Sequence, residues 1–108
     1  IYIQNTNTII EVKSVLSTEK CALFPTVFSE RALKQLEKLR DLLSLGYRVH
    51  YSVISLNPYV SSIYFVSDAQ FTPLLKSCID LGMTISAFSC RIDDNRVYIE
   101  KRLQILLP

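Results

Sequence analysis

Glu11 and Lys13 are the residues in this sequence whose types and spacing are best suited to chemistry. They fall within residues 8–16, a mostly apolar stretch rich in β-branched side chains, which predicts a strand. Side chains at positions i and i+2 of a strand point to the same face, with Cα atoms about 7 Å apart. A carboxylate and an ammonium group therefore converge on one point, as metal-dependent cleavage of a phosphodiester requires.

In that chemistry the two side chains have different tasks. Glu11 would hold Mg²⁺ or Mn²⁺, because hard cations prefer oxygen ligands. The cation lowers the pKa of a bound water and offsets negative charge in the transition state. Lys13 would orient the attacking water and stabilise nearby negative charge.

The spacing alone has a simpler interpretation, a strand with one polar face in water. An acidic residue followed two positions later by lysine is expected roughly 0.5 times by chance in such a chain. Against the simpler interpretation, apolar neighbours predict that this strand is mostly buried, and they are Ile9, Ile10, Val12, Val15 and Leu16. A buried ionic pair needs a partner, a metal or a cavity.

The composition is that of an ordinary globular domain, with 108 residues and 49% hydrophobic side chains. This excludes a disordered tail, a collagen-like repeat and a low-complexity linker. A net charge of +2 neither demands nor excludes a nucleic-acid partner. No apolar run is long enough to span a membrane, and no basic leader precedes an apolar segment. Because the chain opens with Ile1, we expect it to be a piece of something longer.

The pattern along the chain alternates strands and helices. Strands are expected at 8–16, 21–24, 47–56 and 83–92, with one or two more across 97–107, and the first two would form a hairpin. One helix runs from the cap residue Ser29 to Gly46, and another begins at Asp68 or Thr72 and ends at Gly82. This order predicts an α/β fold, a mixed β-sheet flanked by helices, as a single domain over 1–108.

Basic residues form a stripe along the first expected helix. Arg31, Lys34 and Lys38 fall on one face at helical spacing, and the first two lie near the helix N-terminus. Phosphate contacts need positive charge and little geometry, and the backbone N–H groups of a helix N-terminus favour anions. The stripe is therefore a candidate nucleic-acid-binding surface, and its alternative is a solvated helix face.

Histidine and tyrosine side chains offer weaker candidates. His50 lies on an alternating strand with no identifiable serine or cysteine partner, so a structural role is expected. Four tyrosines could stack on bases, although packing at the edge of the core is the expected role, and they are Tyr47, Tyr51, Tyr59 and Tyr64.

The cysteines and the C-terminal acidic residues also indicate structural roles. Three cysteines without a C-x-x-C pair indicate reduced thiols in the cytoplasm, and Cys78 is expected in the core. Asp93, Asp94 and Glu100 surround an expected hairpin turn, because a Ca²⁺ loop would need more oxygen ligands at regular spacing.

A series of short motifs resembles the sugar fermentation stimulation protein family (SfsA-like). The first group is Val-Lys-Ser at 12–14, Ala-Leu-Phe-Pro at 22–25, Ser-Glu-Arg at 29–31 and Lys-x-Leu at 34–36. The second is Asp68, Phe71, Leu75 and Gly82, at the spacing of the family's D-P-x-F, Leu and A-x-x-x-G-V pattern. The resemblance covers roughly residues 8–92, in order and without large gaps.

The resemblance implies a restriction-endonuclease-like, PD-(D/E)xK domain, the C-terminal part of a protein whose upstream OB-like domain is absent from this chain. Glu11 and Lys13 fall on the (D/E)xK element. The family is usually described as DNA-binding, with a regulatory link to sugar utilisation. It implies DNA as the partner, no membrane, a cytoplasmic location and Mg²⁺ or Mn²⁺ as the cofactor of any nuclease activity.

The chain departs from the family pattern at three places. The nuclease motif uses an aspartate on the preceding strand, and the chain begins after the expected position. The family's Pro-Asp-Ala is Pro25-Thr26-Val27 here, which removes a carboxylate, and the family's helix histidine is Gln35. Gln35 could contact a phosphate or orient a water. Three functions follow: DNA binding first, a Mg²⁺- or Mn²⁺-dependent nuclease second, and a degenerate nuclease fold for protein interaction third.

Overall fold

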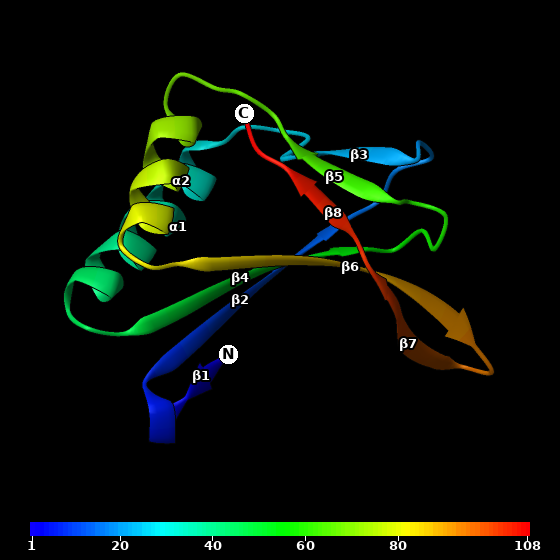
Figure 1. Ribbon diagram of the computed structural model, residues 1–108, viewed down its shortest axis with the longest axis horizontal. Coiled ribbons are helices and arrows are strands. Elements are labelled where there is room, and N and C mark those ends of the chain that lie inside the picture. Colours follow the sequence, from blue (N-terminus) through cyan, green and yellow to red (C-terminus); the bar gives the residue numbers. More distant parts are fainter.

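The computed structural model describes all 108 residues as two sheets and two helices (Figure 1). The strands are β1 (Tyr2–Ile3), β2 (Thr8–Val15), β3 (Cys21–Phe24), β4 (Arg48–Ser55), β5 (Ser62–Phe65), β6 (Thr84–Asp93), β7 (Arg96–Arg102) and β8 (Gln104–Leu106). The helices are α1 (Glu30–Ser44) and α2 (Phe71–Asp80), and a short 3-10 turn covers Gln4–Thr6. Neither helix is long and apolar enough to cross a membrane.

The larger sheet is mixed and has the order β1-β2-β4-β6-β7. Its three middle strands are parallel, whereas β1 and β7 are antiparallel to their neighbours. The smaller sheet, β3-β5-β8, is parallel throughout. The expected α/β architecture with a mixed sheet is therefore present, together with a second sheet that the sequence did not predict.

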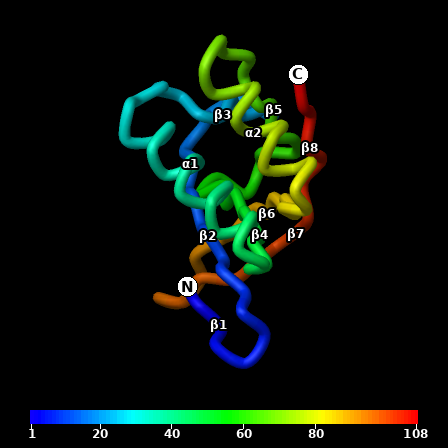
Figure 2. Tube along the Cα trace, turned by 90° about the vertical axis from the view of Figure 1, so that its left-hand side faces the viewer, coloured from blue at the N-terminus to red at the C-terminus, as the bar shows by residue number.

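Both helices cover the same face of the larger sheet, as Figures 1 and 2 show. The crossovers from β2 to β4 through α1 and from β4 to β6 through α2 step in the same direction across the sheet. Crossovers of the usual right hand then place both helices on one side. We call this helix-covered side the inner face.

The core lies between the inner face, the two helices and the smaller sheet. It is one cluster of 19 buried residues, to which every one of these layers contributes. From the larger sheet come Tyr51 and Val53, and from the smaller sheet comes Phe65, whose ring lies 5.3 Å from that of Phe24. The layers are thus held together by apolar contacts, which stabilise roughly in proportion to the area they remove from water.

Local capping explains where the helices begin. The Ser29 hydroxyl accepts a hydrogen bond from the Ala32 N–H at 3.1 Å, which confirms Ser29 as the cap of α1. At α2 the Asp68 carboxylate accepts from the N–H groups of Gln70 and Phe71, at 2.9 and 2.8 Å. The helix begins at Phe71 with Gln70 at the N-cap position, so neither expected start is the helix boundary. The Asp68 carboxylate holds the turn that leads into α2, and Thr72 lies inside the helix.

Several expectations about strand pairing are wrong. Residues 8–16 and 21–24 form no hairpin, because β2 pairs with β4 in one sheet and β3 with β5 in the other. The expected connection over 57–67 contains β5, and β1 precedes the first expected strand. The segment 97–107 does form two strands, as one of the two expectations allowed, one in each sheet on either side of the buried Leu103. The pairings β2–β4, β3–β5 and β5–β8 join distant segments, which local patterns do not specify.

The core predicts a sharp difference between two leucines of the α1 region. Leu36 is 1% exposed and Leu45, at the end of the helix, is 75% exposed. We expect Leu36→Ala to lower the free energy of unfolding by about 2–5 kcal/mol, because it removes buried methyl groups and leaves a cavity. The matched Leu45→Ala change should cost no more than about 0.5 kcal/mol. Urea unfolding measures both, and equal losses would contradict this account of the core.

Candidate functional site

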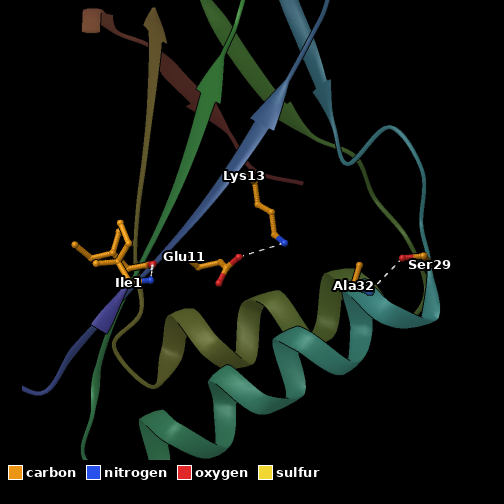
Figure 3. A network of polar contacts seen from close by, with 6 residues as sticks. Ile1, Glu11, Lys13, Ser29 and Ala32 are labelled. Carbon is orange, nitrogen blue, oxygen red and sulfur yellow. Dashed lines mark hydrogen bonds and ion pairs between the residues drawn. The ribbon is translucent and has the colours of Figure 1, made fainter. Parts of the chain in front are cut away.

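Glu11 and Lys13 form an ion pair on the inner face of β2. The Lys13 Nζ lies 3.3 Å from the Glu11 Oε1. In the parallel register Glu11 lies opposite Tyr51 and Lys13 opposite Val53, both of which are buried on that face. Figure 3 shows the two side chains reaching from β2 towards the helices, with the Lys13 ammonium on the side of Ser29 and Ala32. The expected convergence of a carboxylate and an ammonium group is therefore present.

The pair is half-exposed, because β2 is less buried than its sequence predicts. The Lys13 side chain is 32% exposed and that of Glu11 is 23% exposed. Val12 and Leu16 are exposed, which contradicts the expectation of a mostly buried strand. The reason is that β1 pairs with β2 only along Thr8–Ile9, with a further backbone contact at Ile10. Beyond Ile10, that side of β2 has no neighbouring strand. Water reaches the pair, so its burial does not by itself require a metal.

A cleft of about 390 Å³ opens beside Lys13, between the end of β2 and the loop that leads into α1. Its lining is mostly apolar and includes Leu16, Val27, Tyr51 and Phe71. Ala32 of the first turn of α1 also lines it, so this cleft joins the ion pair to the helix N-terminus. Its walls come from separate segments of the chain, and no local sequence motif predicted it.

Tyr51 is a buried group of the site that sequence reasoning assigned only to the edge of the core. Its ring packs against Phe24, with centroids 6.2 Å apart and the rings nearly perpendicular. Burial, and after it the negative charge of Glu11, raise the pKa of the Tyr51 phenol well above its ordinary value. The phenol is therefore a neutral hydrogen-bond donor at physiological pH.

The basic stripe of α1 is exposed, as both of its interpretations require. Arg31, Lys34 and Lys38 all lie on the solvent side of the helix. Lys34 forms an exposed ion pair with Glu30 at 3.4 Å, one turn earlier. Exposed pairs of this kind contribute little to stability, so the charges remain available to a ligand.

Gln35 and Thr26 occupy the positions where the sequence departs from the family pattern. Gln35 is half-buried and lies one turn after Ala32 on the same side of α1. No hydrogen bond joins it to Glu11 or Lys13. Thr26 lines the same cleft as Lys13. A carboxylate at position 26 would therefore lie at the site, and the threonine hydroxyl offers a much weaker metal ligand.

The donor set limits how a divalent cation could be held. No three His, Cys, Asp or Glu side chains come together anywhere in the chain. Mg²⁺ commonly keeps several waters and takes only one or two carboxylates together with phosphate oxygens. Glu11 therefore fits a cation shared with water and substrate, and the chain does not offer an all-protein cage.

His50 lies on the opposite, outer face of the larger sheet, in a network of hydroxyl groups. Its Nδ1 is 2.6 Å from the Thr84 Oγ1, and its Nε2 is 2.8 Å from the Ser86 Oγ. Ser86 is thus a serine neighbour of His50 that the sequence alone did not identify. Ser86 is buried and donates on to the Ser52 hydroxyl at 3.3 Å, and no carboxylate joins the set. These contacts agree with a structural role.

The remaining candidates take structural positions. Asp94 and Asn95 have φ angles of 50° and 59°, which is the left-handed pair of a tight β-hairpin turn between β6 and β7. The cysteines are free thiols, and Cys78 is buried in the core as expected. Burial raises the pKa of the Cys78 thiol, with Arg40 opposing the shift. Among the tyrosines, Tyr59 is the most exposed and Tyr51 alone is fully buried.

Comparison with known sequences gives one consistent family. The family described as Sugar fermentation stimulation protein RE domain matches residues 1–96. A sugar fermentation stimulation protein homolog of Ruminiclostridium cellulolyticum is 30% identical over 103 residues, and one of Desulforamulus reducens is 34% identical over 101. Each alignment covers 91% of this chain but only 45% and 42% of the respective relative. The chain spans less than half the length of these relatives.

A solved structure shares the fold. It is described as the structure of Pyrococcus furiosus SfsA in complex with Ca²⁺. The similarity has a TM-score of 0.77 at 24% identity and covers 91% of this chain and 44% of that one. The mixed sheet with both helices on one face is therefore an arrangement that a related protein also adopts.

The raised pKa of Tyr51 predicts how stability depends on pH. An unfolded chain loses the phenol proton near pH 10.0, whereas the folded chain keeps it. The contribution of this group is therefore fully present below pH 10.0 and is lost as pH rises above it. We expect urea unfolding to show a steeper fall in stability above this pH for the natural chain than for Tyr51→Phe, by up to about 1.4 kcal/mol per pH unit. Equal slopes would contradict the assignment.

Proposed function

The chain belongs to the sugar fermentation stimulation protein family, and from this premise we propose that it binds DNA through Lys13 and the first turns of α1. The observation that carries the proposal is the shared cleft, which brings Lys13 of β2 together with Ala32 of α1. The exposed Arg31 and Lys34 lie beside Ala32 in the sequence. Lys13 and the first turn of α1 thus share one cleft, and Arg31 and Lys34 add positive charge on the solvent side of the same helix.

This arrangement suits the DNA backbone better than the net charge suggests. The +2 net charge is spread over the chain, but a phosphate responds to the charges within a Debye length of about 10 Å. Free N–H groups in the first turn of a helix add a partial positive charge at the same place. A backbone phosphate near Lys13 would therefore meet an ammonium group and a helix N-terminus together, while the Glu11 carboxylate, 3.3 Å from that ammonium, opposes part of the attraction.

Cleavage of DNA with Mg²⁺ or Mn²⁺ is the second candidate function. It is favoured by the distance of 3.3 Å between Lys13 and Glu11, and by the Ca²⁺ named in the description of the Pyrococcus furiosus relative. The Glu-x-Lys element on a parallel central strand also supports the restriction-endonuclease-like assignment of the fold. A bound divalent cation would supply an activated water and offset negative charge on the phosphate.

The residues of this chain contribute to such a reaction in separate ways. Glu11 would hold the cation with one carboxylate, and its ion pair with Lys13 fixes the direction of that carboxylate. Lys13 places a positive charge where the phosphate gains negative charge. Gln35, one turn along α1 from the cleft, would orient a water or contact a phosphate. If the chain neither binds nor cleaves DNA, an interaction module on a degenerate nuclease fold is the function that is left.

DNA binding predicts a characteristic dependence on salt. The logarithm of the affinity should fall linearly with the logarithm of the salt concentration, with a slope of about −0.9 for each phosphate contacted on duplex DNA. Arg31→Ala and Lys38→Ala should each weaken binding and reduce this slope by about one contact. Fluorescence anisotropy across a range of KCl concentrations measures both.

Lys76→Ala is the matched control, because Lys76 is an exposed lysine on α2 and its loss changes the net charge equally. It should leave the slope near its original value. If all three substitutions change the slope equally, the basic stripe of α1 is not the binding surface.

Cleavage predicts loss of activity in substitutions that keep the shape of the side chain. We expect Glu11→Gln and Lys13→Met to reduce Mg²⁺- or Mn²⁺-dependent cleavage by about 10²-fold or more, because each removes a charge aimed at the reacting phosphate. EDTA should abolish cleavage. Glu37→Gln, an exposed glutamate on α1, is the control and should cleave normally. Equal cleavage by all three variants would exclude the pair as a catalytic site.

A further inference from the structure

The cleft beside Lys13 is apolar in a way that phosphate binding does not explain. Seven of its eleven lining residues are hydrophobic, although it lies next to an ion pair. We propose that this cleft receives one unstacked nucleobase, so that the preferred ligand is single-stranded or locally unpaired DNA. The inference rests on the proposed DNA-binding function and names the kind of DNA that this site selects.

Two exposed aliphatic side chains lie at the rim of the cleft. Leu16 follows β2 on one side, Val27 precedes α1 on the other, and each is 73% exposed. Single exposed aliphatic side chains are ordinary on a protein surface. Here two of them line the same cleft, so an apolar ligand in the cleft would cover part of both. The hydrophobic effect therefore favours an occupant with apolar faces.

Buried aromatic side chains are part of the lining of the cleft. Phe71 and Tyr51 line it, and the ring of Phe28 packs edge-on against Phe71 at 5.6 Å between centroids. Phe71 and Tyr51 are each only 2% exposed, so their rings back the cleft with apolar surface and do not offer an open stacking face. The volume of about 390 Å³ lies near the small end of the range for ligand pockets and suits one ring system rather than a helix.

The polar groups of the cleft also match a nucleotide, which has a base at one end and a phosphate at the other. Lys13 supplies an ammonium group beside the apolar walls, and Thr26 supplies a hydroxyl that can donate to or accept from a base edge. The phenol of Tyr51 is a further lining group with a proton to donate. The cleft thus offers apolar, hydrogen-bonding and cationic parts in the combination that a nucleotide presents.

Duplex DNA cannot use such a cleft without losing a base pair. In a duplex the faces of each base are covered by their neighbours, and turning one base outward costs a few kcal/mol. Contacts to phosphates alone would bind single strands and duplexes through charge, with no demand for an unpaired base. A preference for unpaired bases therefore separates use of the cleft from binding through the basic stripe.

The test measures the affinity of the 108-residue chain for three labelled DNAs in EDTA at fixed salt. They are a single-stranded oligonucleotide, the fully paired duplex of the same sequence, and that duplex with one unpaired base. We expect the first and third to bind at least about fivefold more tightly than the duplex, which is what covering about 40 Å² of apolar surface with one base provides.

Leu16→Ser and Val27→Ser test the rim directly, and Leu45→Ser is the matched control. Leu45 is 75% exposed and lies at the far end of α1, away from the cleft. Each rim substitution should bring the affinity for unpaired DNA close to that for the duplex, while Leu45→Ser keeps the difference. Since all three side chains are exposed, their thermal unfolding should stay close to that of the natural chain. Two independent rim variants keep the test valid if one of them unfolds.

Other outcomes would overturn the inference in distinguishable ways. Equal affinity for all three DNAs, or rim variants that keep the preference, would show that the cleft takes no base while DNA binding itself stands. No binding to any of the DNAs would remove the proposed function and this inference together. In that case a mass increase in solution that the rim substitutions abolish would identify a second copy of the chain as the occupant.

Discussion

The register between β2 and β4 is the constraint on which the site depends. It places Glu11 opposite Tyr51 and Lys13 opposite Val53, so all four side chains share the inner face. Tyr51 and Val53 are buried in the core, and their burial holds β4 in place beneath the helices. Because strand side chains alternate, a slip of one residue would turn both charged groups to the outer face and bring Val12 and Ser14 inward. The chemistry of β2 therefore depends on the packing of its neighbour.

The position of β2 near the edge of the sheet explains why the ion pair suits a ligand site. A fully buried pair would pay a large desolvation cost, and a fully exposed one would be screened by water and salt. Here backbone pairing on one side ends at Ile10, and the pair remains partly open to solvent. Beside it lie an apolar cleft and a helix N-terminus. A polyanion with apolar bases matches these neighbouring surfaces at once.

Local signals in the sequence predicted the ion pair and the start of α1. The cleft between them depends on pairings of distant segments, which local signals do not specify. The i, i+2 spacing placed Glu11 and Lys13 on one face, and Ser29 marked the start of α1, because both depend on backbone geometry within a few residues. The burial of β2 was predicted wrongly, since apolar residues such as Val12 and Leu16 lie at an open edge that only the strand order reveals. The cleft was not predicted, because Leu16 and Val27 come to line one cleft only when β3 joins a different sheet from β2.

The most direct measurement is an NMR titration of the chain with a short single-stranded oligonucleotide, followed through the backbone amide resonances. The account predicts that the largest shift changes fall on Lys13 to Leu16, on Thr26 to Phe28 and on the first two turns of α1, as one continuous surface. Residues on the outer face, such as His50 and Ser86, should change little. Shift changes centred on the outer face, on β7 or on α2, or none at all, would contradict the claim that this surface binds DNA.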